Sequence, residues 1–281
     1  MQLTRHDGDT GWWEMARCLP HPALRRDVLG YTGYTEHTLQ PVRRRELPGP
    51  RVSVIISFGP SIDVLSSGDG LLGRLTSFVA GCADRHAVTE YVGGQQGLQI
   101  EFTALGAFRL LGLTGDEIRD GVLDLADLFG HRRVQELTDR LVSAPDWPVR
   151  CSIMDHHVLE LAEDARAVDD AIGWAWQRLV DSRGQTAVGG LAADMGWSRR
   201  HFIQRFQRQA GLSPKTAARV IRFDHAARQL ARRQRISDVA AATGYADHSH
   251  LVRDFRAMAG CTPSQLLAEW GLDDAIPPGQ L

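Results

Sequence analysis

The stretch that decides the fold of the C-terminal part of this chain is Gly244-Tyr-Ala-Asp-His-Ser-His-Leu-Val-Arg-Asp-Phe255. Before it, Ala240 and Ala241 give a short helix a small face that can approach a partner closely, and Gly244 ends that helix by adopting positive φ. Leu251 and Phe255 lie four positions apart and predict a second helix with one buried face. The stretch therefore predicts two short helices joined by a tight turn.

The same pattern occurs earlier, in Val188-Gly-Gly-Leu-Ala-Ala-Asp-Met-Gly-Trp-Ser-Arg-Arg-His-Phe-Ile-Gln-Arg-Phe206. Gly196 and Gly244 are 48 positions apart, whereas Phe206 and Phe255 are 49 apart, so the second turn is one residue longer. Each copy is followed by Gly-x-Ser/Thr-Pro. A stacked helical solenoid would need about three or more copies, but the sequence has only two. They predict a helix-turn-helix that occurs twice.

The second helix of each copy turns polar side chains away from its buried face. Arg and Gln can form paired hydrogen bonds with guanine and adenine edges in the major groove. We expect contacts with DNA bases from the middle of these faces, at Arg200, Gln204, Ser249 and Arg253. We expect contacts with DNA phosphates from the flanks, at Arg199, His201, Arg208, His250 and Arg256.

The charge of the chain is unevenly distributed. The 281 residues carry a formal net charge of −2, but the segment from Asp170 to Trp270 carries +7 and the remainder −9. A basic surface on a helical domain is typical of proteins that bind nucleic acid. Arginine-rich helices that merely face solvent are the alternative explanation of the charge taken alone.

Composition and length predict a globular α+β protein with about two domains. Residues from about Tyr31 to Ala104 alternate between apolar and polar, which favours an antiparallel sheet or small barrel, and helical spacing follows after Gly106. We expect a β-rich region at 1–112, a helical connector or dimerisation region at 113–170, an all-α domain with two helix-turn-helix units at 171–270, and a tail at 271–281.

Residues 184–270 resemble the DNA-binding domain of the AraC/XylS family of bacterial transcription regulators. The run 244–255 and the trailing Gly260-Cys-Thr-Pro263 carry the resemblance, with Tyr245 where phenylalanine is usual. The resemblance implies a sequence-specific transcription regulator, either activator or repressor, with double-stranded DNA and RNA polymerase as partners.

The same resemblance implies a linker helix from Thr216 to about Arg232 that seats both units. In such regulators the linker sets the two recognition helices about one turn of DNA, roughly 34 Å, apart. We expect the linker arginines to face solvent or phosphate rather than bases, namely Arg219, Arg222 and Arg228. The helices within 131–166 resemble the dimer surface of the family, which implies a homodimer.

The N-terminal part resembles the cupin-like sensor regions attached to many such regulators, in Tyr31-Thr-Gly-Tyr-Thr-Glu36 and in an expected hairpin at Gly94-Gln-Gln-Gly-Leu-Gln-Ile100. Cupin enzymes hold a metal with His-x-His, and none occurs before residue 248. We therefore expect no metal, no cofactor and a possible small-molecule effector. Candidate ligand-binding residues are Trp12, Tyr31, Tyr34, Arg43 and Phe58.

Two alternatives to an effector-responsive regulator follow from the same residues. One is a constitutive dimeric regulator without a ligand, and the other is a cupin-like enzyme with a basic accessory domain. No triad or nucleotide-binding pattern supports the enzyme. The longest apolar run, from Val52 to Phe58, is too short to span a membrane, and residues 1–11 lack the apolar segment of a secretion signal. We expect a cytoplasmic protein whose four cysteines are buried or reduced thiols.

Overall fold

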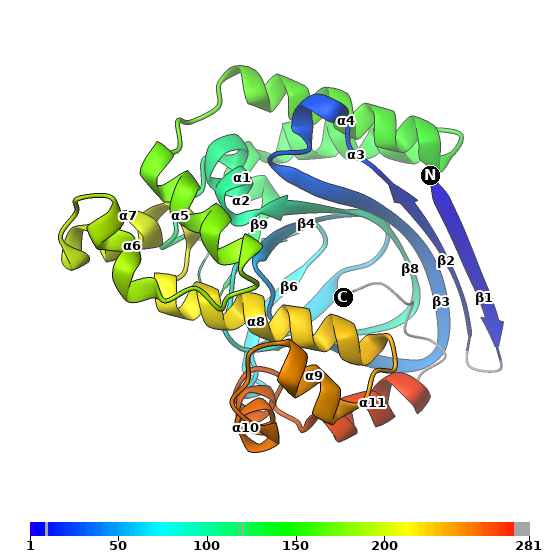
Figure 1. Ribbon diagram of the computed structural model, residues 1–281. Helices are drawn as coiled ribbons and strands as arrows, with labels where there is room; N and C mark the ends of the chain where they lie inside the picture. The colour runs from blue at the N-terminus through cyan, green and yellow to red at the C-terminus, as the bar shows by residue number, and fades with distance from the viewer. Residues whose placement is uncertain (9–10, 118, 120, 273–281) are drawn as a thin grey trace.

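The computed structural model describes residues 1–8, 11–117, 119 and 121–272. These residues form a curved β-rich N-terminal half and a helical C-terminal half that lies against it (Figure 1). Residues 273–281, most of the expected tail, lie outside the described residues.

The N-terminal half is built on an antiparallel sheet with the strand order β1-β2-β3-β8-β4-β7-β9, and β5 pairs with both β6 and β8. Two long strands form its centre, because β3 and β8 pair from Val28 opposite Phe102 to Glu46 opposite Ala87. The described strands are β1 (Gln2–Gly8), β2 (Gly11–Cys18), β3 (Val28–Glu46), β4 (Arg51–Ser57), β5 (Ile62–Leu65), β6 (Leu71–Leu75), β7 (Phe78–Ala80), β8 (Ala87–Thr103) and β9 (Val122–Asp124).

Two expectations for this half are wrong. The segment 94–100 is not a hairpin but the middle of β8, which continues because it pairs with β3 on one side and β4 on the other. Gly97 serves close packing there, since a Cβ at this position would come within 2.5 Å of the Tyr34 hydroxyl. The connector is also not wholly helical, because Val122–Asp124 adds β9 to the edge of the sheet next to β7.

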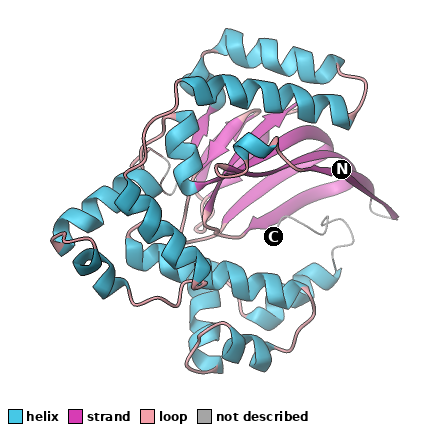
Figure 2. Cartoon of the chain, turned by 45° about the horizontal axis from the view of Figure 1, so that its top comes forward, coloured by secondary structure: helices cyan, strands magenta, loops and turns pink. Residues whose placement is uncertain are grey.

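The two faces of the sheet have different neighbours because successive side chains in a strand point to opposite sides. Helices α3 (His131–Ser143) and α4 (Trp147–Glu163) cover the outer face (Figure 2). Trp147 lies against Gly33, where a Cβ would be 2.3 Å from the indole ring. The opposite, inner face of the sheet encloses a cavity.

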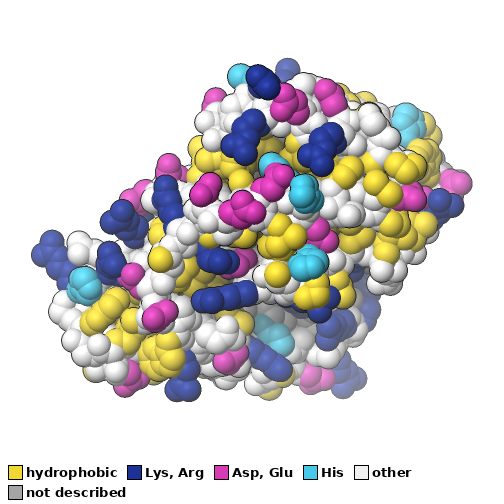
Figure 3. Space-filling model, turned by 90° about the horizontal axis from the view of Figure 1, so that it is seen from above, with side chains coloured by type: hydrophobic (Ala, Val, Ile, Leu, Met, Phe, Trp, Pro, Cys, Tyr) yellow, Lys and Arg dark blue, Asp and Glu magenta, His cyan; other side chains and the backbone are white. Residues whose placement is uncertain are grey.

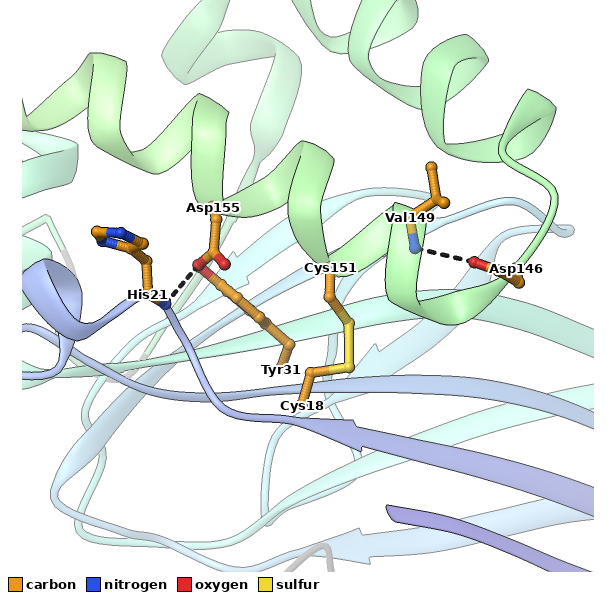
Figure 4. The surroundings of a disulfide bond; sticks show 7 residues. All are labelled: Cys18, His21, Tyr31, Asp146, Val149, Cys151 and Asp155. Atoms are coloured by element: carbon orange, nitrogen blue, oxygen red, sulfur yellow. Dashed lines mark hydrogen bonds between the residues drawn. A yellow bond between two sulfur atoms is a disulfide. The ribbon is translucent and has the colours of Figure 1, made fainter. Parts of the chain in front are cut away.

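A disulfide bond fastens α4 to the sheet. Cys18, at the end of β2, is bonded to Cys151 in α4, with their Cα atoms 6.6 Å apart (Figure 4). Beside it the Tyr31 hydroxyl donates a hydrogen bond to Asp155, at 2.9 Å. The expectation of four unpaired thiols is therefore wrong for two of them, because the fold brings together cysteines that are 133 positions apart. Cys82 and Cys261 are free and buried.

The C-terminal half contains the two predicted helix-turn-helix units and the linker. Gly196 and Gly244 adopt φ of +68° and +75° in the two turns. The predicted linker is α8, which begins at Pro214 after the capping residue Ser213. The remaining described helices are α1 (Ala104–Gly106), α2 (Leu125–Phe129), α5 (Asp170–Asp181), α6 (Val188–Asp194), α7 (Arg199–Ala210), α8 (Pro214–Ala231), α9 (Ile236–Ala242), α10 (His248–Met258) and α11 (Pro263–Leu272), with short 3-10 and π turns at Pro22–Leu24 and Ala107–Leu111.

Candidate functional site

The first recognition helix, α7, is fixed by its cap and its buried face. The Ser198 side chain accepts a hydrogen bond from the backbone amide of His201, which satisfies a donor in the first turn. Phe202 and Phe206 are fully buried, and Phe206 lies 6.0 Å from Trp176 of α5 between ring centroids. The opposite side of α7 is exposed to solvent, and it carries Arg199, Arg200, His201, Gln204 and Arg208.

The second recognition helix, α10, is built in the same way. Asp247 caps its first turn, and Phe255 packs on Phe223 of the linker helix with ring centroids 4.8 Å apart. Ser249, Arg253 and Arg256 are exposed. The side chain of His250 is only half-exposed, because its ring lies edge-on against Tyr245 at 5.1 Å.

The exposed arginines of both recognition helices leave most of their guanidinium donors to solvent, and Arg253 Nε donates a hydrogen bond to the backbone carbonyl of Ser249 at 3.3 Å. None of them is in an ion pair with any residue that the structure describes, and this holds for Arg199, Arg200, Arg208, Arg253 and Arg256. A cluster of unpaired cations is costly unless water or an anion satisfies it. Both recognition helices therefore present positive charge to an anionic partner.

The arginines of the linker helix behave differently from our expectation. Arg219 Nε is 3.0 Å from Asp254 Oδ1 on α10, and Arg222 is 3.7 Å from the other carboxylate oxygen. Arg228 pairs with Asp224, one turn earlier on α8. Arg219 and Arg222 join the linker helix to the second recognition helix, where buried Asp254 would otherwise lack a counter-charge, whereas the pair of Arg228 lies within α8.

The cavity of the N-terminal half has a volume of about 550 Å³ and opens on the inner face of the sheet. Of the five expected ligand-binding residues, only Tyr34 lines it. Tyr31 points to the outer face, and Phe58 lies under Arg150 at 5.7 Å. Trp12 is 44% exposed, and Arg43 lies outside in ion pairs with Asp69 and Glu90. None of these four residues lines the cavity.

Charged residues that the sequence did not single out form one wall of the cavity. Arg44, next to the expected Arg43, is buried with its guanidinium 3.1 Å from Glu36, and Tyr91 donates a hydrogen bond to the same carboxylate at 2.8 Å. Strand alternation is the signal that could have found Arg44, because only alternate members of an Arg-Arg-Arg run can share a face. Glu46, two residues further along β3, accepts a hydrogen bond from Thr89 at 2.9 Å.

The wall of the cavity also contacts the DNA-binding half. Arg51 lines the cavity, and its guanidinium donates a hydrogen bond to Asp224 of α8 at 2.7 Å. His86 lines it as well, and its backbone amide donates to the carbonyl of Met258 at the end of α10, at 2.7 Å. The wall of the cavity is therefore joined by direct contacts to the linker helix and to the second recognition helix.

A third contact joins the N-terminal half to the first recognition helix. The backbone amide of Gly115 donates to the carbonyl of Arg208, near the end of α7, at 2.7 Å. Gly115 has no room for a side chain, since a Cβ there would lie 1.8 Å from the carbonyl oxygen of Gln207. Both recognition helices are thus held at their C-terminal ends, while their exposed faces stay clear.

Neither metal chemistry nor a membrane span finds support among the described residues. Within residues 1–8, 11–117, 119 and 121–272, no group of three or more His, Cys, Asp or Glu side chains is placed to hold a metal ion. In the same residues no helix is long and apolar enough to cross a bilayer.

Comparison with known proteins identifies a domain within the helical half. Residues 191–269 match the family described as helix-turn-helix domain. No curated protein matches the chain. A crystal structure of ToxT from Vibrio cholerae superposes with a TM-score of 0.50 at 9% identity, over 92% of this chain and 98% of that chain. ToxT of strain SCE256 with a bound unsaturated fatty acid gives 0.48 at 10% identity, over 94% and 97%.

These likenesses agree with the geometry of the two halves. The first structure shares the β-rich half followed by the helical half, and at such low identity the likeness concerns the fold alone. The matched domain spans the second helix-turn-helix unit, the linker and most of the first unit. The chain therefore carries a helix-turn-helix domain at residues 191–269, in a fold like that of ToxT.

Proposed function

We propose that this chain is a transcription regulator of the AraC/XylS family. It would read a specific DNA sequence by placing α7 and α10 in successive major grooves. The observation that carries the proposal is the set of five exposed arginines without ion-pair partners on these two helices. Arg200, Gln204, Ser249 and Arg253 lie where base edges would be read. Arg199, His201, Arg208, His250 and Arg256 lie where phosphates would be bound, with His250 the weakest of these because it packs on Tyr245.

Competition binding on randomised operators tests the reading of bases. Arg200→Ala should lose about 1 to 3 kcal/mol on the cognate site and relax the preference at one or two base positions. Arg208→Ala should instead weaken all sequences alike and lower the salt slope by about 1. Arg132→Ala is the control, because it removes an exposed arginine from α3 in the other half. An equal loss for all sequences in Arg200→Ala would show that Arg200 does not read bases.

The cavity is, in our proposal, an effector site that controls DNA binding. Its support is structural continuity, since Arg51 belongs both to the cavity wall and to an ion pair with Asp224 on the linker helix. A ligand that shifts Arg51 changes the position of α8, and linkage requires DNA to change the ligand affinity by the same factor.

A ligand screen followed by one variant tests this control. Compounds that raise the melting temperature of the full chain should also change its DNA affinity. In Asp224→Asn these compounds should still bind, but their effect on DNA affinity should fall. If no compound in a broad screen both stabilises the chain and alters DNA binding, the N-terminal half is a constitutive module.

The homodimer proposal places the contact on α3 and α4. Val142 and Val149 are exposed on these helices at 51% and 39%, and Figure 3 shows hydrophobic side chains among charges of both signs on the face seen from above. Burial of such apolar area favours association. Sedimentation of the full chain should give a dimer that Val142→Asp weakens, whereas Val180→Asp, on α5, should leave it intact. We place RNA polymerase as a further partner once the dimer is on DNA.

A further inference from the structure

The cavity wall has an excess of carboxylates over cations. Arg44, Arg51 and Arg85 are its arginines, whereas its acidic residues are Glu36, Glu46, Asp84 and Glu101; the carboxylate of Glu14 is turned to Arg5 and Trp147 on the outer face. Two of the arginines are already engaged inside the protein. Arg44 is paired with Glu36, and Arg51 lies between Asp224 at 2.7 Å and Glu101 at 3.5 Å.

Glu46 is the carboxylate of this wall whose charge is least compensated. Its side chain receives a hydrogen bond from the Thr89 hydroxyl, and no ion pair reaches it from any described residue. Arg44, two residues before it, is turned to Glu36. Burial raises the pKa of Glu46, the effect being opposed in part by the charge of Arg44. Glu46 is partly exposed in the cavity wall, and a cation that joins it there would compensate its charge.

The rest of the lining is suited to an apolar body next to that charge. Aromatic rings from three strands face the cavity, namely Trp13 of β2, Tyr34 of β3 and Tyr91 of β8. Aliphatic side chains complete it, among them Ile55, Ile62 and Val64. Aromatic faces attract cations, and aliphatic walls gain free energy by removing apolar surface from water.

An anionic ligand would meet two obstacles in the same space. To reach the guanidinium of Arg44 it would displace Glu36, and to reach that of Arg51 it would displace Asp224 and Glu101, which leaves these carboxylates without their partners. Arg85, the remaining arginine of the lining, is exposed to solvent, where water screens an ion pair. It would also bring a second negative charge toward Glu46. A cation meets neither obstacle.

We propose that the cavity binds an amphiphilic organic cation, with its ammonium group against the Glu46 carboxylate and its apolar body among Trp13, Tyr34 and Tyr91. The inference rests on the proposed function of the cavity as an effector site, and it adds the chemical class of the effector.

Three probes with the same apolar body and different head groups test this class on the full chain. Naphthylbutylamine, naphthylbutanol and naphthylbutanoate carry a positive, a neutral and a negative head group at neutral pH, and calorimetric titration gives their affinities. The amine should bind at least about tenfold more tightly than the alcohol, and the carboxylate should bind most weakly. Tighter binding of the alcohol or of the carboxylate overturns the class, as does the absence of binding by the amine.

A matched pair of variants assigns the preference to Glu46. In Glu46→Gln the ratio of the affinity for the amine to the affinity for the alcohol should fall by about tenfold, while the affinity for the alcohol stays unchanged. Glu90→Gln makes the same change on β8 outside the cavity, where Glu90 pairs with Arg43, and should keep the ratio. An unchanged ratio in Glu46→Gln overturns the assignment. If the alcohol or the carboxylate binds best and alters DNA affinity, the cation class fails but the effector function stands.

Discussion

Asp254 is the residue on which the position of the second recognition helix depends most. It lies on the buried side of α10, 6% exposed, and faces Arg219 and Arg222 of the linker helix. Asp254→Ala should lower the free energy of unfolding by about 2 to 3 kcal/mol, because it removes charge-assisted contacts from a dry site. Urea unfolding measures the loss. Asp194→Ala, an exposed change at the end of α6, is the control, and equal effects of both variants would contradict this role.

Glu46 gives a prediction about pH that needs no ligand. Burial raises the pKa of this carboxyl above its ordinary 4.5. Between the ordinary and the raised value the folded chain binds more protons than the unfolded chain, so stability falls as pH rises through that window. Glu46→Gln should therefore raise the melting temperature at neutral pH, and the gain should vanish as pH falls toward 4.5. A gain that is independent of pH would point to packing instead of charge.

At the level of elements, the disulfide couples β2 to α4. It closes a loop of 133 positions, and a crosslink of that length stabilises a fold by about 2 to 4 kcal/mol. A reducing agent should therefore lower the melting temperature of the protein. The double variant Cys18→Ser, Cys151→Ser should start lower and show no response to the reductant, although it keeps Cys82 and Cys261. A response of the same size in the double variant would assign the effect to those two thiols.

The helical elements could be predicted from the sequence because their determinants are local. The repeat, its glycines and its apolar pairs predicted a second helix in each unit, and in the structure the first of these is α7 at Arg199–Ala210. The family resemblance implied a linker from Thr216 to about Arg232, close to α8 at Pro214–Ala231. Caps and helical periodicity depend on residues that are close in the sequence, so a single sequence is enough to predict these helices. The cysteine pair could not be predicted, because its members meet only when α4 lies on the finished sheet.

The inward and outward faces of the strands were harder to predict, because they depend on pairing with strands that are distant in the sequence. The register of β3 against β8 shifts between Thr38 and Val42, where four positions of β3 face two of β8. Because both numbers are even, Arg44 keeps the face of Tyr34 and Glu36, and only the pairing reveals this. One part was within reach of the sequence, since Tyr31 and Tyr34 are three positions apart in a strand and cannot both face inward.

For the whole molecule, the boundary between the halves is earlier than residue 171. Asp169 binds Arg205 of α7 through two hydrogen bonds of 2.9 and 3.0 Å, and its backbone amide donates to Gln209. A fragment that begins at residue 167 should therefore have a free energy of unfolding about 1 to 3 kcal/mol higher than that of a fragment that begins at 171. Thermal unfolding of both fragments measures the difference. Asp169→Ala should remove most of it in the longer fragment, and equal stability of the two wild-type fragments would restore the boundary at 171.

The backbone hydrogen bonds from the N-terminal half to both recognition helices have a consequence for avidity. Gly115 holds the end of α7 and His86 holds the end of α10, so the two helices cannot search for their sites independently. Once one helix is bound, the other meets its site at an effective concentration that is high at one spacing and negligible at others. Inserting half a helical turn of DNA between the two half-sites should thus abolish the gain in affinity that comes from binding both helices, even when each half-site alone keeps its affinity.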